Sequence, residues 1–348
     1  MEKIRLGKTN LMVTRIGFGG IPIQRLNEND AVAVVKRCLD LGINFIDTAN
    51  AYSTSEERIG KAIAGRREGL ILATKTTSRS GKGVKAHIEQ SLKQLGVDSL
   101  DLYQFHSVSD FGSLDMVLAP DGPMAAVEEA KKAGKIKHVG ITSHQIDVAK
   151  KAVATGRFET IMFPFNFVTD EAERELLPLA REHDVGFIDM KPLAGGMITT
   201  AKIAFKYLFQ FPDVATIPGI EKLHEIDEIV DILNRPLKLT AAEKKEMQKL
   251  KKQLGTRFCH RCDYCQPCKE GIAISTVMIY PSLAARLPSN QLYSGFWSAV
   301  MDKAAACSLC GECEERCPYH LPIRDMIAEH YEQYERDKTN YERSASSK

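Results

Sequence analysis

The 348-residue sequence lacks any long uncharged apolar run, and arginines at Arg5 and Arg15 interrupt its first 20 residues. A bilayer-spanning helix needs about 20 mostly apolar residues, and a secretory signal needs an apolar segment of about 7–15. We therefore expect a cytoplasmic protein without a membrane partner. An excess of one charge sign is also lacking, since the formal net charge is +2 and lysines and glutamates interleave. This balance gives no reason to expect nucleic acid as a partner.

Cysteine is nearly missing from the first 254 residues, where Cys38 stands alone, whereas the other eight of the nine cysteines follow Gly255. A reducing cytoplasm disfavours structural disulfides, so gathered cysteines indicate metal binding. Cys38 lies on the apolar face of an expected helix, which favours a packing role. The change in composition predicts a first domain over residues 1–254, a second over 255–336, and a polar, frayed tail over 337–348.

Residues 15–233 alternate short apolar runs with longer helical patterns. After a hairpin at residues 4–14, we expect strands over 15–19, 44–47, 70–75, 100–106, 138–143, 160–164, 186–190 and 214–218. Helices are expected over 30–41 (with Asp30 as its N-cap), 55–63, 82–95, 121–133, 144–155, 170–183, 199–211 and 222–233, before a charged linker helix over 240–254. This repetition predicts an α/β protein with a closed (β/α)8 TIM barrel. No GxGxxG follows the first strand, which argues against a Rossmann fold.

Four titratable side chains fall at or just after the ends of successive predicted strands: Asp47, Tyr52, Lys75 and His106. Barrel enzymes carry reactive groups at this end, so we expect the four to meet. A tyrosine, with an ordinary pKa near ~10, becomes a more useful acid beside a cation. Lys75 supplies that cation, Asp47 orients it, and His106 polarises a carbonyl group that Tyr52 protonates. Taken singly, an Asp at a strand end more often caps a helix or turn, a Lys there is usually a solvated surface charge, and a His is more often structural than catalytic; the set of four is what favours catalysis.

The stretch NFIDTANAYSTSEERIGKAI, which contains Asp47 and Tyr52, resembles the signature of the aldo-keto reductase superfamily. The segments ILATKT, LDLYQFH, GKIKHVGITSH and TIPGIEKLHEI resemble it in the same order, so the resemblance covers residues 1–234. It implies that Asp47, Tyr52, Lys75 and His106 form a catalytic tetrad. It also implies reversible reduction of a small-molecule carbonyl compound, or oxidation of an alcohol, with NAD(P)H.

The same resemblance implies a set of residues that contact the nicotinamide cofactor: Ser143, His144, Asn166, Met190, Pro218, Gly219 and Lys222. Met162 stands where a glutamine is common, and Met190 stands where an aromatic side chain is common. Among the positions that meet a 2′-phosphate, Glu221 repels such a group and Lys222 attracts it. We expect NAD(P)H, and a flavin or another ring system stays open as an alternative.

Two cysteine groups carry a more specific signal. CHRCDYCQPC contains Cys259, Cys262, Cys265 and Cys268, and CSLCGECEERCP contains Cys307, Cys310, Cys313 and Cys317. The second group matches the CxxCxxCxxxCP run of bacterial ferredoxins, in which the fourth cysteine binds the other cluster. We therefore expect one [4Fe–4S] cluster on Cys259, Cys262, Cys265 and Cys317, and a second on Cys268, Cys307, Cys310 and Cys313. A pair of zinc sites is the alternative.

Apolar residues at helical spacing near Leu292, Phe296, Val300 and Met301 predict a helical insert between the cysteine groups. The whole chain resembles the branch of aldo-keto reductases with a C-terminal 4Fe-4S ferredoxin-type domain, and we expect that module near the barrel mouth. The resulting prediction is an oxidoreductase whose clusters exchange electrons with a partner protein. The alternative is an altered, non-catalytic barrel in an electron-transfer or redox-sensing protein with structural or regulatory clusters.

Overall fold

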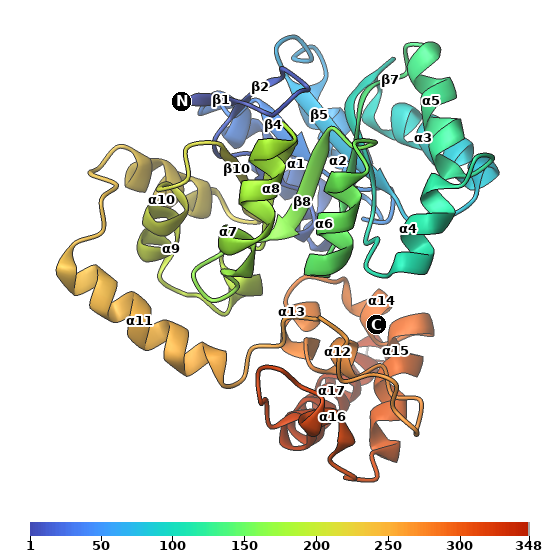
Figure 1. Ribbon diagram of the computed structural model, residues 1–348, viewed down its shortest axis with the longest axis vertical. Helices are drawn as coiled ribbons and strands as arrows, with labels where there is room; N and C mark the ends of the chain where they lie inside the picture. Colours follow the sequence, from blue (N-terminus) through green and yellow to red (C-terminus); the bar gives the residue numbers. More distant parts are fainter. Residues whose placement is uncertain (347–348) are drawn as a thin grey trace. The chain divides into compact units, whose positions relative to one another are not determined.

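The computed structural model describes residues 1–346, and the chain divides after Glu243 into two compact units (Figure 1). Unit 1 comprises Met1–Glu243, and unit 2 begins at Lys244. Helix α11 (Ala241–Gly255) runs across this division and also across the boundary expected at residues 254 and 255, which stays a prediction. Within the described residues, no helix combines the length and the apolar character that crossing a membrane requires.

Unit 1 contains an eight-stranded parallel sheet rolled into a nearly closed barrel. Its strands lie side by side in chain order: β3 (Phe18–Gly19), β4 (Phe45–Asp47), β5 (Ile71–Thr76), β6 (Leu100–Phe105), β7 (Ile136–Thr142), β8 (Thr160–Pro164), β9 (Gly186–Met190) and β10 (Val214–Ile217). Bridges from Ile16 to Thr216 and from Gly19 to Gly219 join the first strand to the last. The predicted fold class is confirmed.

Helices follow the strands and cover the outside of the barrel, as α6 and α8 do beside β8 (Figure 1). They are α1 (Glu28–Asp40), α2 (Ser55–Ile63), α3 (Gly81–Leu95), α4 (Phe111–Leu118), α5 (Pro123–Lys132), α6 (Ile146–Ala154), α7 (Glu171–Arg174), α8 (Leu176–Glu182), α9 (Ala201–Leu208) and α10 (Leu223–Leu233). Short 3-10 turns, η1 (Pro22–Arg25) and η2 (Ala194–Gly196), follow β3 and β9. Because alternate strand residues point inward, Phe45, Leu102 and Ile188 fill the barrel interior.

An N-terminal hairpin of β1 (Lys3–Arg5) and β2 (Met12–Thr14) contributes Ile4 and Val13 to that interior core. The hairpin approaches β9 so closely that a Cβ on Gly7 would lie 2.2 Å from the nitrogen of Gly186. Gly7 also has φ +52, a left-handed conformation that favours glycine. The hairpin can therefore pack against the strand beginnings only with glycine at this position.

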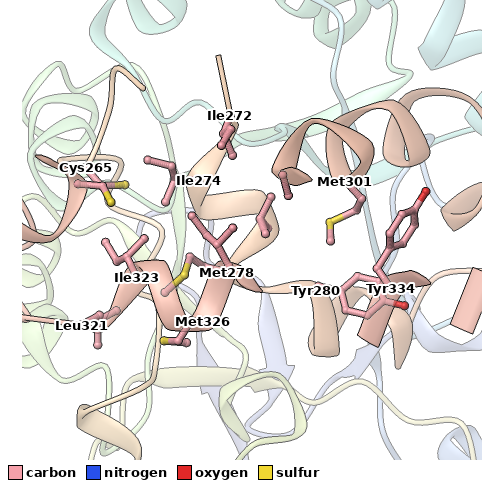
Figure 2. Packing of buried hydrophobic residues seen from close by; sticks show 14 of the residues in the cluster. Cys265, Ile272, Ile274, Met278, Tyr280, Met301, Leu321, Ile323, Met326 and Tyr334 are labelled. Atoms are coloured by element: carbon pink, nitrogen blue, oxygen red, sulfur yellow. The ribbon is translucent and has the colours of Figure 1, made fainter. Parts of the chain in front are cut away.

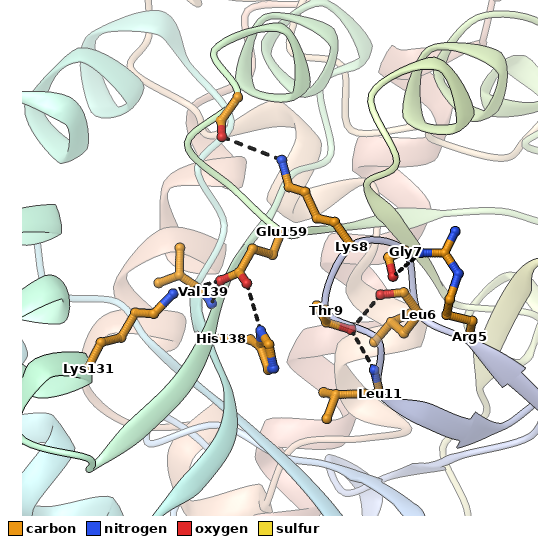
Figure 3. Close-up of polar contacts among 11 residues, drawn as sticks. Arg5, Leu6, Gly7, Lys8, Thr9, Leu11, Lys131, His138, Val139 and Glu159 are labelled. Carbon is orange, nitrogen blue, oxygen red and sulfur yellow. Dashed lines mark hydrogen bonds and ion pairs between the residues drawn. The ribbon is translucent and has the colours of Figure 1, made fainter.

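Charged side chains hold the beginnings of several strands in place, as Figure 3 shows for Glu159. The Glu159 carboxylate lies 2.6 Å from His138 Nδ1 and accepts bonds from Lys131 at 2.9 Å and the backbone N–H of Val139 at 2.8 Å. Burial raises the pKa of Glu159, but these contacts together lower it to about 2. This half-buried carboxylate therefore stays ionised and ties α5 to β7 and β8.

Three helix predictions differ from the structure. Asn27, not Asp30, caps α1: its side chain accepts from the backbone N–H of Asp30 at 2.9 Å. Helix α4 begins after Asp110, whose side chain caps it, in a segment for which no helix was expected. The single helix expected over residues 170–183 is broken between α7 and α8. Pro178 explains the break, because its ring clashes with the carbonyl group four residues earlier.

Unit 2 is helical beyond α11, as expected for the insert between the cysteine groups. It contains α12 (Ile274–Val277), α13 (Tyr280–Ala284), α14 (Ser289–Leu292), α15 (Gly295–Asp302), η3 (Lys303–Ala306), α16 (Glu312–Glu315) and α17 (Ile323–Ser346). Figure 2 shows the core of this unit, in which the rings of Tyr280 and Tyr334 lie beside Met301. Of the residues expected to form the apolar pattern, Leu292 and Met301 are buried, whereas Phe296 is 71% exposed.

Helix α17 continues to Ser346, through a segment for which a frayed tail was expected; residues 347–348 lie outside the described residues. Contacts with the rest of unit 2 explain this order. The hydroxyl group of Tyr280 donates to Asp337 at 2.7 Å, and Lys338 pairs with Asp302 at 3.1 Å. The ring of Tyr341 packs 5.4 Å from that of Tyr293.

Candidate active site and candidate cluster sites

Asp47 and Lys75 form a buried ion pair at the carboxyl ends of neighbouring strands β4 and β5. Lys75 Nζ lies 2.5 Å from Asp47 Oδ1 and donates a second bond to the backbone oxygen of Thr48 at 2.7 Å. Both side chains are almost inaccessible, at 1% and 3% exposed. The strands bring these two residues together because parallel strands end at the same edge of the barrel.

The charge states of this pair follow from its burial. Burial alone would lower the pKa of Lys75, but the charges of Asp47 and Tyr52 and the hydrogen bonds with both raise it above its ordinary value. For Asp47, burial raises the pKa, and the charge of Lys75 and bonds from Lys75 and Gln104 oppose that rise. Lys75 is therefore held as an ammonium ion.

Tyr52 and His106 lie next to the ion pair. Lys75 Nζ is 5.1 Å from the centre of the Tyr52 ring, and the rings of Tyr52 and His106 meet edge to face with centres 5.6 Å apart. Both side chains are half-buried, unlike Asp47 and Lys75. The structure thus brings all four predicted tetrad residues together, with the two that could meet a substrate nearest to solvent.

Two further residues organise this site, and neither was predicted from the sequence. Gln104 donates to Asp47 Oδ2 at 3.0 Å, and Arg79 donates to the backbone oxygens of His106 and Ser107 at 2.6 and 3.2 Å. Gln104 could have been found, because it lies on β6 two residues before His106, which follows the strand, and alternate residues face the same side. Arg79 lies in a loop, where no periodicity marks its direction.

The residues expected to contact a nicotinamide ring line the ends of later strands, and several bond to the backbone. Asn166 Oδ1 accepts from the N–H groups of Val168 and Thr169, each at 2.9 Å, while its Nδ2 donates to the oxygen of Lys191 at 3.0 Å. Ser143 Oγ exchanges bonds with the backbone of Gln145. In this structure, Asn166 and Ser143 shape the loops that follow their strands.

The remaining cofactor positions lie at three strand ends. His144 is half-buried and its backbone N–H donates to Ser109 Oγ at 3.1 Å. Met190 ends β9 and is half-buried beside the interior core. The oxygen of Pro218 accepts from Gly19 N at 2.8 Å, which helps to close the barrel, and Gly219 and Lys222 are exposed beyond β10.

The loop after β9 has an unusual, tightly turned backbone. Lys191, Ala194, Gly195 and Gly196 all have positive φ values, from 47° to 94°. The turn is held by its own backbone: the N–H of Ala194 donates to the oxygen of Lys191 at 2.9 Å, and the N–H of Gly196 donates to that of Leu193 at 2.8 Å. A Cβ on Gly196 would meet no heavy atom within 4 Å.

Unit 2 contains two cavities, each surrounded by four cysteines. Cavity A is lined by residues that include Cys259, Cys262, Cys265 and Cys317. Cavity B is lined by residues that include Cys268, Cys307, Cys310 and Cys313. Each cavity thus takes three cysteines from one group and the fourth from the other, the same two sets that the sequence predicts as cluster ligands.

The geometry of the cavities fits a cluster better than a single ion. A zinc ion holds its sulfur ligands at about 2.3 Å, so four thiols would have to converge on one point. Throughout residues 1–346, no three Cys, His, Asp or Glu side chains converge in that way. The thiols instead surround a volume, as ligands at the corners of an iron–sulfur cubane do.

The two cavities differ in their surroundings. Cavity A is flanked by His260 and Tyr319, whose rings stack with centres 3.7 Å apart and planes 4° from parallel. Phe258 meets the His260 ring edge to face. Cavity B instead includes the exposed Cys310, which follows Leu309, itself 59% exposed. Cavity B therefore faces solvent more openly.

Two family models match the chain. The model described as "Aldo/keto reductase family" matches residues 15–203, and the model described as "4Fe-4S dicluster domain" matches residues 258–322. The first match lies in unit 1, and the second contains all eight cysteines that line the cavities.

Curated relatives match more than half of the chain. The "Uncharacterized oxidoreductase YqkF" of Bacillus subtilis is 32% identical over 213 residues, which is 57% of this chain and 67% of that protein. The "L-galactose dehydrogenase" of Arabidopsis thaliana is 34% identical over 218 residues, again 57% of this chain and 67% of that protein.

Solved structures agree with the barrel fold. The holo form of the aldo-keto reductase AKR11C1 from Bacillus halodurans is 28% identical, with a TM-score of 0.62 over 72% of this chain and 96% of that one. An aldo-keto reductase from Klebsiella pneumoniae in complex with NADPH is 22% identical, with a TM-score of 0.61 over 72% of this chain and 94% of that one. The second likeness concerns the fold alone.

Proposed function

We propose that this chain, which belongs to the aldo/keto reductase family and carries a 4Fe-4S dicluster domain, interconverts a small-molecule carbonyl compound and the corresponding alcohol in its barrel. The observation that carries this proposal is the buried Asp47–Lys75 ion pair beneath the half-buried rings of Tyr52 and His106. That arrangement provides an acid next to a fixed cation, which is what protonation of a carbonyl oxygen requires.

A nicotinamide, when bound, supplies or accepts the hydride. In the reductive direction, Tyr52 donates its hydroxyl proton to the carbonyl oxygen of the substrate. Lys75 stabilises the negative charge left on the tyrosine oxygen, and Asp47 keeps Lys75 in place and charged. His106 donates a hydrogen bond to the same carbonyl oxygen and orients the substrate. In the oxidative direction the proton returns to Tyr52 from the alcohol.

Two relatives support a nicotinamide and a carbonyl or alcohol substrate. One is named a dehydrogenase of L-galactose, and a structure of similar fold contains NADPH. We propose that His144, Met190 and the ends of β8 and β10 surround the nicotinamide half.

The test is anaerobic turnover of simple aldehydes with NADH and with NADPH. Tyr52→Phe should lower kcat by about 10²–10⁴-fold, the usual contribution of a positioned proton donor. Tyr103→Phe is the matched control, because Tyr103 is buried on β6 outside the tetrad and its loss should change kcat less than twofold. Equal rates for wild type and Tyr52→Phe would remove Tyr52 from the mechanism.

We propose further that the cysteines lining cavities A and B each hold one [4Fe–4S] cluster, and that these clusters exchange single electrons with a partner protein. Anaerobic iron and sulfide analysis should find about eight of each per chain, with visible absorbance that dithionite bleaches. About four irons would leave one cavity without a cluster. Zinc without iron would contradict this part of the proposal.

A further inference from the structure

His106 follows strand β6 directly, and bonds from three neighbouring segments fix its backbone. Its N–H donates to the oxygen of Thr76, at the end of β5, at 2.8 Å. Its carbonyl oxygen accepts from Arg79 Nη2 at 2.6 Å. The N–H of the next residue, Ser107, donates to Thr142 Oγ1 of β7 at 2.8 Å. The direction of the His106 ring therefore depends on both neighbouring strands and on Arg79.

The chain turns sharply immediately after His106. Ser107 has φ +52, a left-handed conformation that is costly for a residue with a side chain. Arg79 Nη2 donates to the carbonyl oxygens on both sides of this turn, that of His106 at 2.6 Å and that of Ser107 at 3.2 Å. A strained backbone persists only where its surroundings hold it, and such positions cluster at active sites. Arg79 clamps this turn from its carbonyl side.

The other nitrogen of the guanidinium group binds the loop from which Arg79 comes. Nη1 donates to the oxygen of Thr77 at 3.2 Å, so Arg79 joins the loop after β5 to the loop after β6. Arg79 is half-buried, and burial lowers its pKa, an effect that the charge of Asp110 partly offsets. An arginine keeps its charge in proteins, and its planar fork presents several N–H donors at fixed angles. This geometry suits an arginine and not a lysine, whose donors share one nitrogen atom.

We infer that Arg79 is a positioning residue that holds His106 in the direction from which its ring donates to the carbonyl oxygen of the substrate. The segment that ends β5 then serves the site twice. Lys75 supplies the cation beside Tyr52, and Arg79 fixes the turn that follows from the next strand. Misplacement of a catalytic group by about 1 Å can cost about 10²-fold in rate, so a clamp on its backbone matters to kcat. This inference rests on the proposed function, in which His106 contacts the substrate.

Kinetics of the holoprotein with a simple aldehyde and NADH or NADPH test the role. Arg79→Ala should lower kcat by about 10–100-fold and leave the KM for the nicotinamide within about twofold, because His106 meets the carbonyl group and not the cofactor. Unchanged kcat in this variant overturns the inference, and the Tyr52→Phe test of the proposed function is unaffected.

Arg67→Ala is the matched control. Arg67 is also half-buried and donates to the backbone oxygens of Leu70 and Ser99, but these residues lie where β5 and β6 begin. Its loss should lower stability and leave kcat nearly unchanged. An equal loss of kcat in Arg67→Ala and Arg79→Ala contradicts a specific role for Arg79.

A double-mutant cycle separates positioning of His106 from general damage to the barrel. Because Arg79 acts through His106, Arg79→Ala should change kcat very little once His106→Ala has removed the ring. A loss as large in that background as in the wild-type background overturns the inference.

The ring is also observed without turnover. In nitrogen-15 NMR spectra of the histidine rings, the signals of His106 are identified by their loss in His106→Ala. They should be sharp in wild type and in Arg67→Ala, and broadened or multiple in Arg79→Ala. A single sharp signal at an unchanged position in Arg79→Ala overturns the inference and leaves the proposed function standing. A wild-type protein that reduces no aldehyde overturns both, since no substrate then receives the bond from His106.

Discussion

The amide group of Gln104 is buried beside the candidate active site, where its nitrogen donates to Asp47 Oδ2 and its oxygen has no partner. Asp47 therefore receives bonds on both oxygens, one from Lys75 and one from Gln104. A carboxylate fixed in this way presents Lys75 in one position. In the proposed tetrad, Gln104 is thus a positioning residue that acts through Asp47.

Replacement of Gln104 by leucine should destabilise the barrel and impair the tetrad. A lost hydrogen bond to a buried charged group costs about 1.5–3 kcal/mol, so the free energy of unfolding should fall by that amount. Chemical denaturation followed by circular dichroism measures this change. In a double-mutant cycle, Gln104→Leu should cost much less in an Asp47→Asn background. Additive effects would show that the two side chains are not coupled.

Glu159 should make stability depend on acid pH. Its folded pKa of about 2 lies below the ordinary value of 4.5, so its contribution is complete above about pH 4.5 and is lost as pH falls towards 2. Glu159→Gln should therefore lower the free energy of unfolding by about 2 kcal/mol at pH 7, after allowance for its partial exposure. The difference from wild type should shrink on acidification. A difference that stays constant from pH 7 to pH 3 contradicts this origin.

Among single residues, the sequence predicted those whose spacing marks strand ends. Asp47, Lys75 and His106 could be placed at one edge because each closes an apolar run, and the structure brings them together. Arg79 was not identified, because an arginine in a loop looks the same whether or not it donates to the loop beside it. Its role depends on the path of that loop, which periodicity does not encode.

At the level of elements, the presence of a helix was predicted more reliably than the residues at which it begins and ends. Helix α4 was missed because FGSLDMVL is short, contains glycine and lacks a polar face, and only the cap at Asp110 marks its start. The break between α7 and α8 could have been predicted from Pro178. The cysteine-bearing loops have almost no regular structure, so residue spacing, not periodicity, carried the information there.

The stacked rings of His260 and Tyr319 should protect the cluster proposed for cavity A. Tyr319→Leu removes the stack, so oxygen and water should reach that cluster several-fold faster. We expect about half of the visible absorbance to decay faster in air than it does in wild type, while the other half is unchanged. Tyr264→Leu is the control, because Tyr264 lies in the same cysteine group but is 49% exposed. Equal decay in Tyr319→Leu and wild type would argue against a protective stack.

At the scale of the whole molecule, the two units should respond differently to removal of iron. The barrel of unit 1 has its own core and closed sheet, whereas the cysteine segments of unit 2 have little regular structure of their own. Metal binding free energy in such a domain is folding free energy. Chelation after mild oxidation should therefore unfold residues 256–322 while the barrel persists.

Hydrogen exchange followed by mass spectrometry measures this difference segment by segment. We expect protection to be lost around both cysteine groups and α12, and to be retained in β4–β9 within twofold. Cys38 serves as an internal reference, because its pKa is raised to about 12 by burial in the barrel and it should resist alkylation throughout. Loss of protection in both units together would show that they unfold as one.

Ile274, the first residue of α12, lines cavity A and cavity B alike. Ile274 therefore forms part of the wall between the two cavities. Each cavity also takes its fourth cysteine from the other cysteine group, so each depends on both segments of the chain. Assembly of a cluster in either cavity would order the shared wall at Ile274 and one cysteine of the other cavity's set. Assembly of one cluster should accordingly speed assembly of the other when iron is delivered.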